Sequence, residues 1–379
     1  MNVFSVKHSD LLRQDERFIE KNDVSELIKK TIHNLINIQD ETGEFLLHLD
    51  DGRTIDTKGW AGWEWTHGIG LYGIYKYYEQ TSDPHALGII DEWFKERFSE
   101  RLATKNVNTM CPFLTLAYRY EETGRKEWLP YLQSWAEWVM YEMPRTKRGG
   151  LQHIVYNNEN HQQMWDDTLM MTVLPLAKIG LLLNKPEYVE EAKYQFLLHI
   201  QYLMDRQSGA WFHGWTFDGH HNYANALWAR GNSWVTIVIP EFLELLDLPK
   251  TDSFHRYLIQ VLEAQVEALI QWQSDSGLWH TLLDDPSSYL EASATAGFSY
   301  GLLKAIRLRY IDASYFDAAE KAIKGVINNI NSDGELEQVS FGTAMGENLD
   351  YYRNIPLTST PYGQAMAILC LSEYMRTYL

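Results

Sequence analysis

Two adjacent carboxylates are the most distinctive candidates for chemistry in this sequence. Asp166 and Asp167 follow Trp165 and precede a segment that is apolar on nearly every helical face. Because consecutive helix residues point about 100° apart, the two carboxylates are not expected to share one task. Asp166 suits an N-cap, which accepts hydrogen bonds from backbone N–H groups of the first turn. Asp167 shares a face with Met171 and Leu174, so the sequence predicts that its carboxylate points into an interior pocket.

The environment predicted for Asp167 has two opposite effects on the pKa of its carboxyl group. An apolar pocket raises a carboxyl pKa and favours a proton donor. The N-terminus of a helix lowers the pKa, because its dipole stabilises negative charge. Between these influences a single aspartate can act alternately as acid and base, so Asp167 is the main catalytic candidate.

Two further candidates lie in aromatic segments. His213 stands in AWFHGWTF, and Arg230 stands in WARGNSW between Trp228 and Trp234. A guanidinium can hold a carboxylate through its planar fork, so Arg230 is a candidate for binding an acidic ligand. The alternative is that Arg230 forms a salt bridge at the mouth of the site.

Aromatic residues are concentrated beside glycine and histidine outside the periodic segments. The chain has 14 Trp and 23 Tyr, and GWAGWEWTHG alone holds Trp63 and Trp65 on either side of Glu64. Aromatic faces in loops pack well on flat ligand surfaces such as sugar rings, which favours a carbohydrate ligand. The alternative is that these residues anchor the loops against the core.

The histidines do not form a recognisable metal-binding pattern. His153, His161, His220 and His221 are lesser candidates, and the adjacent pair lacks companion Asp, Glu or His residues at ligand spacing. The sequence therefore predicts neither a metal nor another cofactor.

Composition limits the classes of function. Lys and Arg total 33 against 51 Asp and Glu, giving a net charge of −18, which argues against nucleic acid and anionic membranes as partners.

Cys111 and Cys370 form no CxxC pair, so neither a disulfide framework nor a zinc cluster is expected. With no apolar leader and no membrane-length apolar run, we expect a cytoplasmic protein. No linker divides residues 1–379, so we expect a single domain.

Helical periodicity is widespread and strand signals are weak. Alternate helices are amphipathic, whereas those between them are apolar or small nearly all round, as buried helices are. The twelve helices expected span 24–38, 66–80, 85–100, 108–123, 126–142, 167–182, 186–206, 230–247, 253–273, 291–309, 314–330 and 359–377.

A loop with glycine and an aromatic or aliphatic residue recurs along the chain. It reads TGEF at 42–45, GGLQH at 149–153, SGAWFH at 208–213, SGLWH at 276–280 and DGELE at 333–337. Most spacings are about sixty residues, which fits one helical hairpin with its loop, and repeats of this kind form closed or stacked arrays. The predicted fold is all-α: a six-hairpin α/α toroid with an inner and an outer ring.

Unusual polar clusters precede each apolar helix. In a toroid the N-termini of the inner helices share one face, so these clusters are expected to converge on one mouth, where helix dipoles favour bound anions. The clusters are GWEWTHG (62–68), NVNTM (106–110), MWDD (164–167), LWARGN (227–232), LEASAT (290–295) and TSTP (358–361).

Three motifs in the sequence carry a family resemblance. MWDDTLMMTVLPLA (164–177), WFHGW (211–215) and WARGNSW (228–234) resemble the unsaturated rhamnogalacturonyl hydrolases of glycoside hydrolase family 105, and more distantly the unsaturated glucuronyl hydrolases of family 88. The resemblance covers about residues 20–379. It implies a substrate left by polysaccharide lyases, which ends in a 4,5-unsaturated uronic acid. An aspartate protonates carbon 4, water adds at carbon 5, and the resulting hemiketal opens and expels the neighbouring sugar.

The resemblance also implies roles for individual residues. Asp167, the second Asp of WDDT, would be the acid and base, and His213 would contact the uronate. Trp228, Arg230 and Trp234 would shape the subsites, with Arg230 near the substrate carboxylate.

Four more residues are assigned to substrate binding. Trp63 and Trp65 would be stacking surfaces, and Trp165 precedes the aspartate pair. Family 88 relatives carry a second acid on an earlier inner helix, where this chain offers Asn108. Because lysis erases the difference at carbon 4, the sequence leaves open whether the substrate derives from galacturonate or glucuronate.

Three alternatives remain at this point. Hydration of an enol ether needs one carboxylate, whereas an ordinary glycosidase needs two, so an inverting glycosidase would pair Asp167 with a second acid such as Glu64. A sugar epimerase would need paired histidines deep in the lumen. In a non-catalytic carbohydrate-binding protein Asp167 would be only a helix cap. The leaving-side sugar and the oligomeric state are left open by the sequence.

Overall fold

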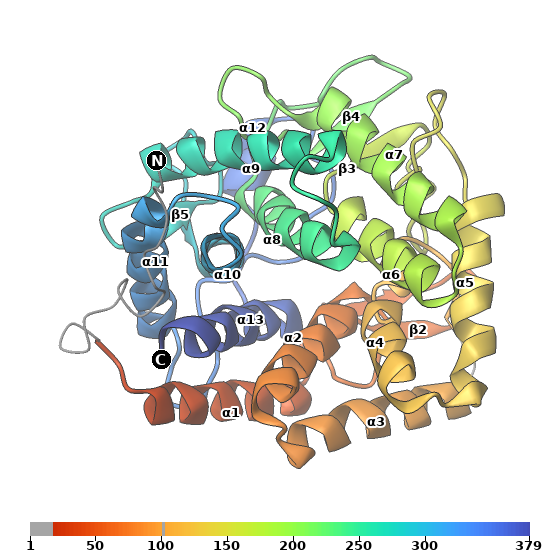
Figure 1. The fold of residues 1–379 in the computed structure, drawn as a ribbon, viewed down its shortest axis with the longest axis horizontal. Coiled ribbons are helices and arrows are strands. Elements are labelled where there is room, and N and C mark those ends of the chain that lie inside the picture. The colour runs from red at the N-terminus through yellow and green to blue at the C-terminus, as the bar shows by residue number, and fades with distance from the viewer. Residues whose placement is uncertain (1–17, 101–102) are drawn as a thin grey trace.

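The computed structural model describes residues 18–100 and 103–379, and helices form most of it (Figure 1). Each of the twelve predicted ranges corresponds to a helix, and the short α12 was not predicted. Expectations drawn from the N-terminal segment fall on residues 1–17, outside the described residues. The α-helices are α1 (Lys21–Asn37), α2 (Trp65–Thr81), α3 (Pro84–Ser99), α4 (Phe113–Thr123), α5 (Leu129–Tyr141), α6 (Leu174–Leu182), α7 (Pro186–Leu203), α8 (Ala229–Leu246), α9 (Ser253–Trp272), α10 (Ala292–Arg307), α11 (Phe316–Asn328), α12 (Leu349–Arg353) and α13 (Pro361–Tyr378).

The long helices form two concentric rings, which confirms the predicted α/α toroid (Figure 1). The inner ring holds α2, α4, α6, α8, α10 and α13, and contacts between α13 and α2 close it. The outer ring is amphipathic: α1 buries Val24, Ile28, Thr31, Ile32 and Leu35, spaced by three or four residues, as one face of a helix requires. By contrast, every residue of α8 from Ala229 to Leu243 is buried. None of the helices in the described ranges is both long and apolar enough to cross a bilayer.

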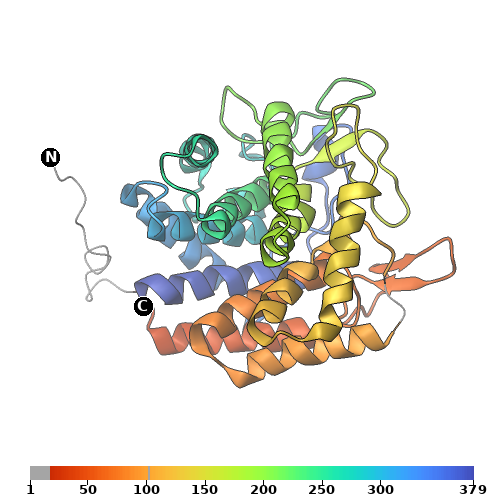
Figure 2. The same ribbon diagram turned by 45° about the vertical axis from the view of Figure 1, so that its right-hand side comes forward.

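Three small two-stranded antiparallel sheets lie next to the starts of inner helices. Figure 2 shows the β1–β2 hairpin projecting from the side of the molecule opposite the C-terminus. The pairing of β3 with β4 places Trp165 opposite Gly214, so the aspartate pair and His213 are brought together. The paired strands are β1 (Leu46–His48) with β2 (Thr54–Asp56), β3 (Gln163–Trp165) with β4 (Gly214–Thr216), and β5 (Trp279–His280) with β6 (Leu290–Glu291).

Four shorter helical turns complete the fold. The 3-10 turns η3 (Asn108–Met110), η4 (Lys126–Trp128) and η6 (Ala313–Tyr315) precede α4, α5 and α11. The fourth, η5 (Leu169–Val173), is a π-helical turn that leads into α6 directly after the aspartate pair. Single π turns are frequent at functional sites.

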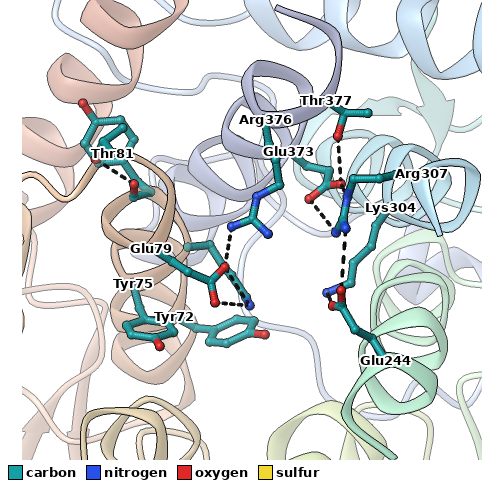
Figure 3. Close-up of polar contacts among 12 residues, drawn as sticks. Tyr72, Tyr75, Glu79, Thr81, Glu244, Lys304, Arg307, Glu373, Arg376 and Thr377 are labelled. Atoms are coloured by element: carbon teal, nitrogen blue, oxygen red, sulfur yellow. Dashed lines mark hydrogen bonds and ion pairs between the residues drawn. The ribbon is translucent and has the colours of Figure 1, made fainter. Parts of the chain in front are cut away.

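The opposite end of the toroid carries a cluster of charged side chains, although the sequence suggested that the inner helices are apolar nearly all round. Figure 3 shows this ion-pair cluster at the C-terminal ends of α2, α8, α10 and α13. Lys304 lies 2.8 Å from Glu241 and 2.6 Å from Glu244, and Arg307 lies 2.5 Å from Glu373. The remaining pairs join Glu79 with Lys76 and with Arg376. Cations are favoured at helix C-termini, which explains their position here.

Candidate active site

A cavity of about 430 Å³ opens where the N-termini of the inner helices meet. Eight of the candidate site residues named from the sequence line it, whereas His213, Trp63 and Trp234 do not. The eight are Glu64, Trp65, Asn108, His153, Trp165, Asp167, Trp228 and Arg230.

Asp167 is the carboxylate that faces this cavity. It precedes η5, and its backbone carbonyl accepts hydrogen bonds from Met170 and Met171, both at 3.0 Å. Its side chain is 17% exposed, and one carboxylate oxygen lies 3.5 Å from Nε2 of His213. Burial is the largest influence and would raise the pKa of the Asp167 carboxyl, but His213, His153 and Asp166 together outweigh burial and lower it. Asp167 therefore rests as a carboxylate that can accept or pass on a proton.

Asp166 is not the N-cap that the sequence predicted. Its side chain is 0% exposed, and neither carboxylate oxygen has a hydrogen-bond donor. Instead the backbone N–H of Asp166 donates to the carbonyl of His213 at 3.0 Å, which turns the side chain into the interior. Burial and the adjacent charge of Asp167 raise the pKa of this carboxyl far above its usual range.

His213 is held between its partners in the wall behind the cavity. Nδ1 lies 2.8 Å from the hydroxyl of Tyr352 on α12, and the backbone N–H donates to the carbonyl of Ala226 at 3.1 Å. The rings of Trp228 and Trp165 lie 4.3 and 5.2 Å from the imidazole. These contacts leave Nε2 directed at Asp167.

Arg230, the second residue of α8, is 1% exposed and mostly engaged with the protein itself. Its guanidinium lies 4.8 Å from the ring centroids of both Trp228 and Tyr362. It lies 3.7 Å from the buried carboxylate of Glu291, so the predicted alternative of a salt bridge is present. The guanidinium N–H groups donate to Ser340 O, Phe341 O and Thr343 Oγ1, each at 2.9 Å, and to Ser340 Oγ.

The segment that Arg230 holds is a wall of the cavity that the sequence did not reveal. Residues 341–344 line it, and the ring of Phe341 packs 4.8 Å from Phe45, above which Lys58 lies at 4.6 Å. Because this stretch has no helical or strand periodicity, no pattern in the sequence pointed to it. The only available signal was the density of Gly, Thr and aromatic residues in FGTAMG.

Two of the predicted tryptophans have structural roles. Trp63 packs against Trp93, Phe113 and Trp135, and its indole N–H donates to the carbonyl of Thr109 at 2.9 Å. Trp234 is fully buried behind Trp65. Both predictions of a stacking or subsite surface are therefore wrong, because these indoles anchor elements to the core.

The remaining aromatic residues supply flat surfaces. Trp65 stacks on Tyr362, with ring centroids 4.6 Å apart. Trp165 stacks on His153 at 4.0 Å, nearly parallel. His153 was only a lesser candidate, and burial lowers the pKa of its imidazole to about 3, so it is neutral at physiological pH.

A second acidic side chain lines the cavity. Glu64 caps α2 by accepting a hydrogen bond from the backbone N–H of Trp65 at 3.0 Å, and it contacts Asn108. Burial raises the pKa of the Glu64 carboxyl to about 8, in spite of these hydrogen bonds. At neutral pH the cavity therefore holds an ionised Asp167 and a protonated Glu64.

One group of side chains has the donor types of a metal site. Two carboxylate oxygens of Asp166 and Asp167 and a ring nitrogen of His213 lie within 4.8 Å of one another. Carboxylates and imidazole are common ligands of divalent cations. His161, His220 and His221 do not belong to this group, and His161 instead lies 2.8 Å from Asp218 at the surface.

Comparison with known proteins agrees with this geometry. The family model described as Glycosyl Hydrolase Family 88 matches residues 21–378. The unsaturated rhamnogalacturonyl hydrolase YesR of Bacillus subtilis is 30% identical over 318 residues, covering 83% of this chain and 90% of that protein.

Two solved structures align with this chain over the full length of both proteins. One, from Salmonella enterica, is described as a possible member of family 105 and is 69% identical with a TM-score of 0.96. The other, from Klebsiella pneumoniae, carries the same description and is 68% identical, also with a TM-score of 0.96. The chain therefore belongs to the glycoside hydrolases that the family 88 model describes, and within them to family 105.

Proposed function

We propose that this glycoside hydrolase removes a 4,5-unsaturated uronic acid from the non-reducing end of oligosaccharides that lyases release from rhamnogalacturonan during pectin degradation. The observation that carries the proposal is the position of Asp167: it is an ionisable carboxylate that faces the cavity and contacts His213. The 30% identity to an unsaturated rhamnogalacturonyl hydrolase supports this choice of substrate.

The chemistry is hydration of an enol ether. Asp167 delivers a proton to carbon 4, and the ring oxygen stabilises the positive charge that develops at carbon 5. Water then adds at carbon 5 while Asp167 accepts a proton from it. The resulting hemiketal opens, and the bond to the leaving sugar breaks. No second carboxylate is needed to activate the leaving group, because the double bond already makes the substrate reactive toward protons.

The other lining residues suit an anionic sugar ring. The aromatic faces for the sugar come from Trp65, Trp165 and Trp228. Asn108 provides a side-chain amide that contacts Glu64. The N-termini of the inner helices contribute positive potential for the uronate carboxylate. In this proposal Arg230 adds charge near that carboxylate and also fixes the wall at residues 341–344.

An inverting glycosidase is the second candidate, and Glu64 is the observation that favours it. Glu64 is a protonated carboxyl in the same cavity as an ionised aspartate, and an inverting enzyme requires such a pair of opposite protonation states. This enzyme would cleave saturated substrates as well and would leave the double bond of an unsaturated uronate intact.

The deciding experiment follows the absorbance of the conjugated unsaturated uronate in a lyase digest of rhamnogalacturonan. We expect the wild type to remove the absorbance and Asp167→Asn to lose activity by about 10²-fold or more, since general acid–base catalysis contributes about 10²–10⁴-fold. Asp317→Asn, an exposed substitution on α11, is the matched control. Release of reducing sugar with the absorbance unchanged would favour the inverting glycosidase. No reaction with any digest would contradict both enzymes.

We further propose that residues 1–379 form one catalytic domain that acts in the cytoplasm. The family model spans nearly the whole chain, which supports a single unit. Cys111 and Cys370 are both buried free thiols, which suits a reducing compartment. Mild proteolysis of the native protein should yield no stable fragment of half the chain length.

A further inference from the structure

The carboxyl group of Asp166 occupies a site that does not stabilise a negative charge. No donor outside the Asp166–Asp167 pair reaches either oxygen, and the side chain is fully buried. The group is pressed against α8: a Cβ at Gly231 would lie 2.3 Å from Oδ2 and 2.7 Å from Oδ1. An isolated carboxylate is very unfavourable in such surroundings, so the group keeps its proton. The strongly raised pKa of Asp166 agrees with this geometric argument.

The hydrogen bonds around His213 identify the acceptor for that proton. The hydroxyl of Tyr352 accepts from the backbone N–H of Gly346 at 3.1 Å, so its own proton is free for Nδ1 of His213 at 2.8 Å. The sulfur of Met345, at 3.7 Å, is the weaker acceptor. Nε2 of His213 then carries hydrogen and lies 3.5 Å from an oxygen of Asp167. The carboxylate of Asp167 is left as the acceptor for the proton of Asp166.

We propose that Asp166 and Asp167 form a dyad that shares one proton, and that Asp166 stores the proton which Asp167 delivers to the substrate. Asp166 does not line the cavity, so it is a positioning residue that acts through Asp167. This proposal rests on the function proposed above. It resolves a difficulty of that function: an aspartate that contacts His213 is ionised at rest, yet the reaction begins with proton donation.

The proton balance of the cycle closes within the dyad. The O–H bond of Asp166 breaks as an O–H bond forms on Asp167, and the proton of Asp167 passes to carbon 4. The π electrons of the double bond form the new C–H bond, and the dyad carries a second negative charge only while the positive charge at carbon 5 lies beside it. Water then forms a bond to carbon 5 and releases one proton to Asp167, from which it returns to Asp166. The net change is addition of one water molecule to the double bond, with no oxidant, reductant or metal.

Several other titratable groups face the dyad and are considered in its test. Asp166 faces Asp167, His213 and Tyr352, and Asp167 also faces His153. His153 is neutral, and burial raises the pKa of the Tyr352 hydroxyl far out of the neutral range. His213 touches Asp167 directly, so His213→Gln is measured in parallel. In the same cavity burial raises the pKa of Glu64 to about 8, so Glu64→Gln is the second reference.

The test compares pH–rate profiles of the wild type, Asp166→Asn and Asp167→Asn on the lyase digest. Asparagine fills the same space but cannot release a proton. We expect kcat of Asp166→Asn to fall by about 10²-fold with KM nearly unchanged, because a proton-transfer partner is lost. The alkaline limb of its profile should move down by at least one pH unit, since Asp167 must then carry the proton itself. An unchanged kcat and profile in a folded Asp166→Asn would overturn the proposal.

A second measurement needs no substrate and therefore separates the dyad from the proposed function. Infrared spectroscopy of the free protein at pH 7 should show the carbonyl band of a protonated carboxylic acid. The band should weaken in Asp166→Asn and persist in Asp167→Asn, with Glu64→Gln identifying the contribution of Glu64. Equal bands in the wild type and Asp166→Asn would contradict a protonated Asp166. If the band behaves as expected but the digest is not consumed, the proposed function fails and the buried dyad stands.

Two further readouts cover the remaining possibilities. If Asp166→Asn does not fold, the wild-type rate is measured in mixtures of H₂O and D₂O. A curved dependence of the rate on the deuterium fraction supports two protons in transit. A linear dependence contradicts proton transfer from Asp166 through Asp167. Native mass spectrometry of the isolated protein should show the mass of the chain alone. A tightly bound divalent ion that is lost in Asp166→Asn would assign the three side chains to a metal and overturn the dyad.

Discussion

Nε2 of His213 lies 3.5 Å from a carboxylate oxygen of Asp167, while Nδ1 of the same ring lies 2.8 Å from the hydroxyl of Tyr352. The imidazole is therefore oriented from both sides, and its position depends on a residue 139 positions further along the chain. A short helix outside the double ring thus controls the environment of the proposed acid.

Removing that hydroxyl should weaken catalysis without emptying the cavity. In Tyr352→Phe the ring still packs, but His213 loses the partner that fixes its tautomer. One hydrogen bond of this kind contributes about 1–1.5 kcal/mol, so we expect kcat to fall about tenfold and KM to change little. Steady-state kinetics on the lyase digest measures both constants. Tyr257→Phe, on the exposed face of α9, is the control, and an equal loss in both variants would refute a specific role.

Although Arg230 is only 1% exposed, we expect it to affect both the stability of the protein and its affinity for substrate. Arg230→Met leaves the buried carboxylate of Glu291 without its cation, and breaking a buried pair from one side costs about 3–5 kcal/mol. Urea unfolding should show this loss, and the double variant Arg230→Met/Glu291→Gln should recover part of it. Arg230→Lys should raise KM, because an ammonium cannot replace the planar fork that holds residues 340–343. Wild-type stability in Arg230→Met would contradict this role.

Glu64 should make the protein less stable as pH rises. Burial raises its pKa to about 8 from an ordinary value of 4.5, so the folded state binds a proton that the unfolded state has lost between these values. The free energy of unfolding should therefore fall through this window, by up to about 1.4 kcal/mol per pH unit from this group, and level off above pH 8. Glu64→Gln should abolish that decline, so its advantage over wild type should grow from pH 5 to pH 8 in urea unfolding. A pH-independent difference would show that Glu64 is already ionised.

The ion-pair cluster at the far end should affect folding and leave catalysis alone. Glu241 contacts Lys304 at 2.8 Å, and although burial opposes ionisation, Lys304 and Lys76 lower its pKa to about 2. The stability that the ionised Glu241 contributes is therefore present above pH 4.5, the pKa of this carboxyl in the unfolded chain. It is lost as pH falls from about 4.5 to about 2. Glu241→Gln should cost about 3–5 kcal/mol at pH 7 while kcat stays unchanged. Glu320→Gln, which breaks an exposed pair with Lys324, should cost less than about 1 kcal/mol.

The helical frame could be predicted because it depends on local periodicity. Outer helices such as α1 show one apolar face, inner helices such as α8 are buried throughout, and this contrast is written in the sequence. The start of each inner helix could be predicted for the same reason. Asp167 and Arg230 therefore lie in the cavity, as expected from their place before an apolar helix.

The rest of the site depends on contacts between distant segments and could not be predicted. Phe341 and Tyr352 come from non-repeating loops and a five-residue helix, and neither has a pattern that reveals its direction. Trp63 resembled a ligand-facing residue because it stands in an aromatic loop, yet its indole fills the core. Asp166 looked like a cap, but pairing of β3 with β4 fixes its backbone and turns its side chain inward.

The ion-pair cluster at the C-terminal ends of α2, α8, α10 and α13 occupies the end of the ring opposite the cavity (Figure 3). Under the proposed function, we therefore expect the unsaturated terminus to enter from the cavity mouth and both products to leave through that same mouth. A product that leaves by the way it entered must vacate the cavity before the next chain end can bind. We thus expect the enzyme to trim chains distributively, returning to solution between one sugar and the next.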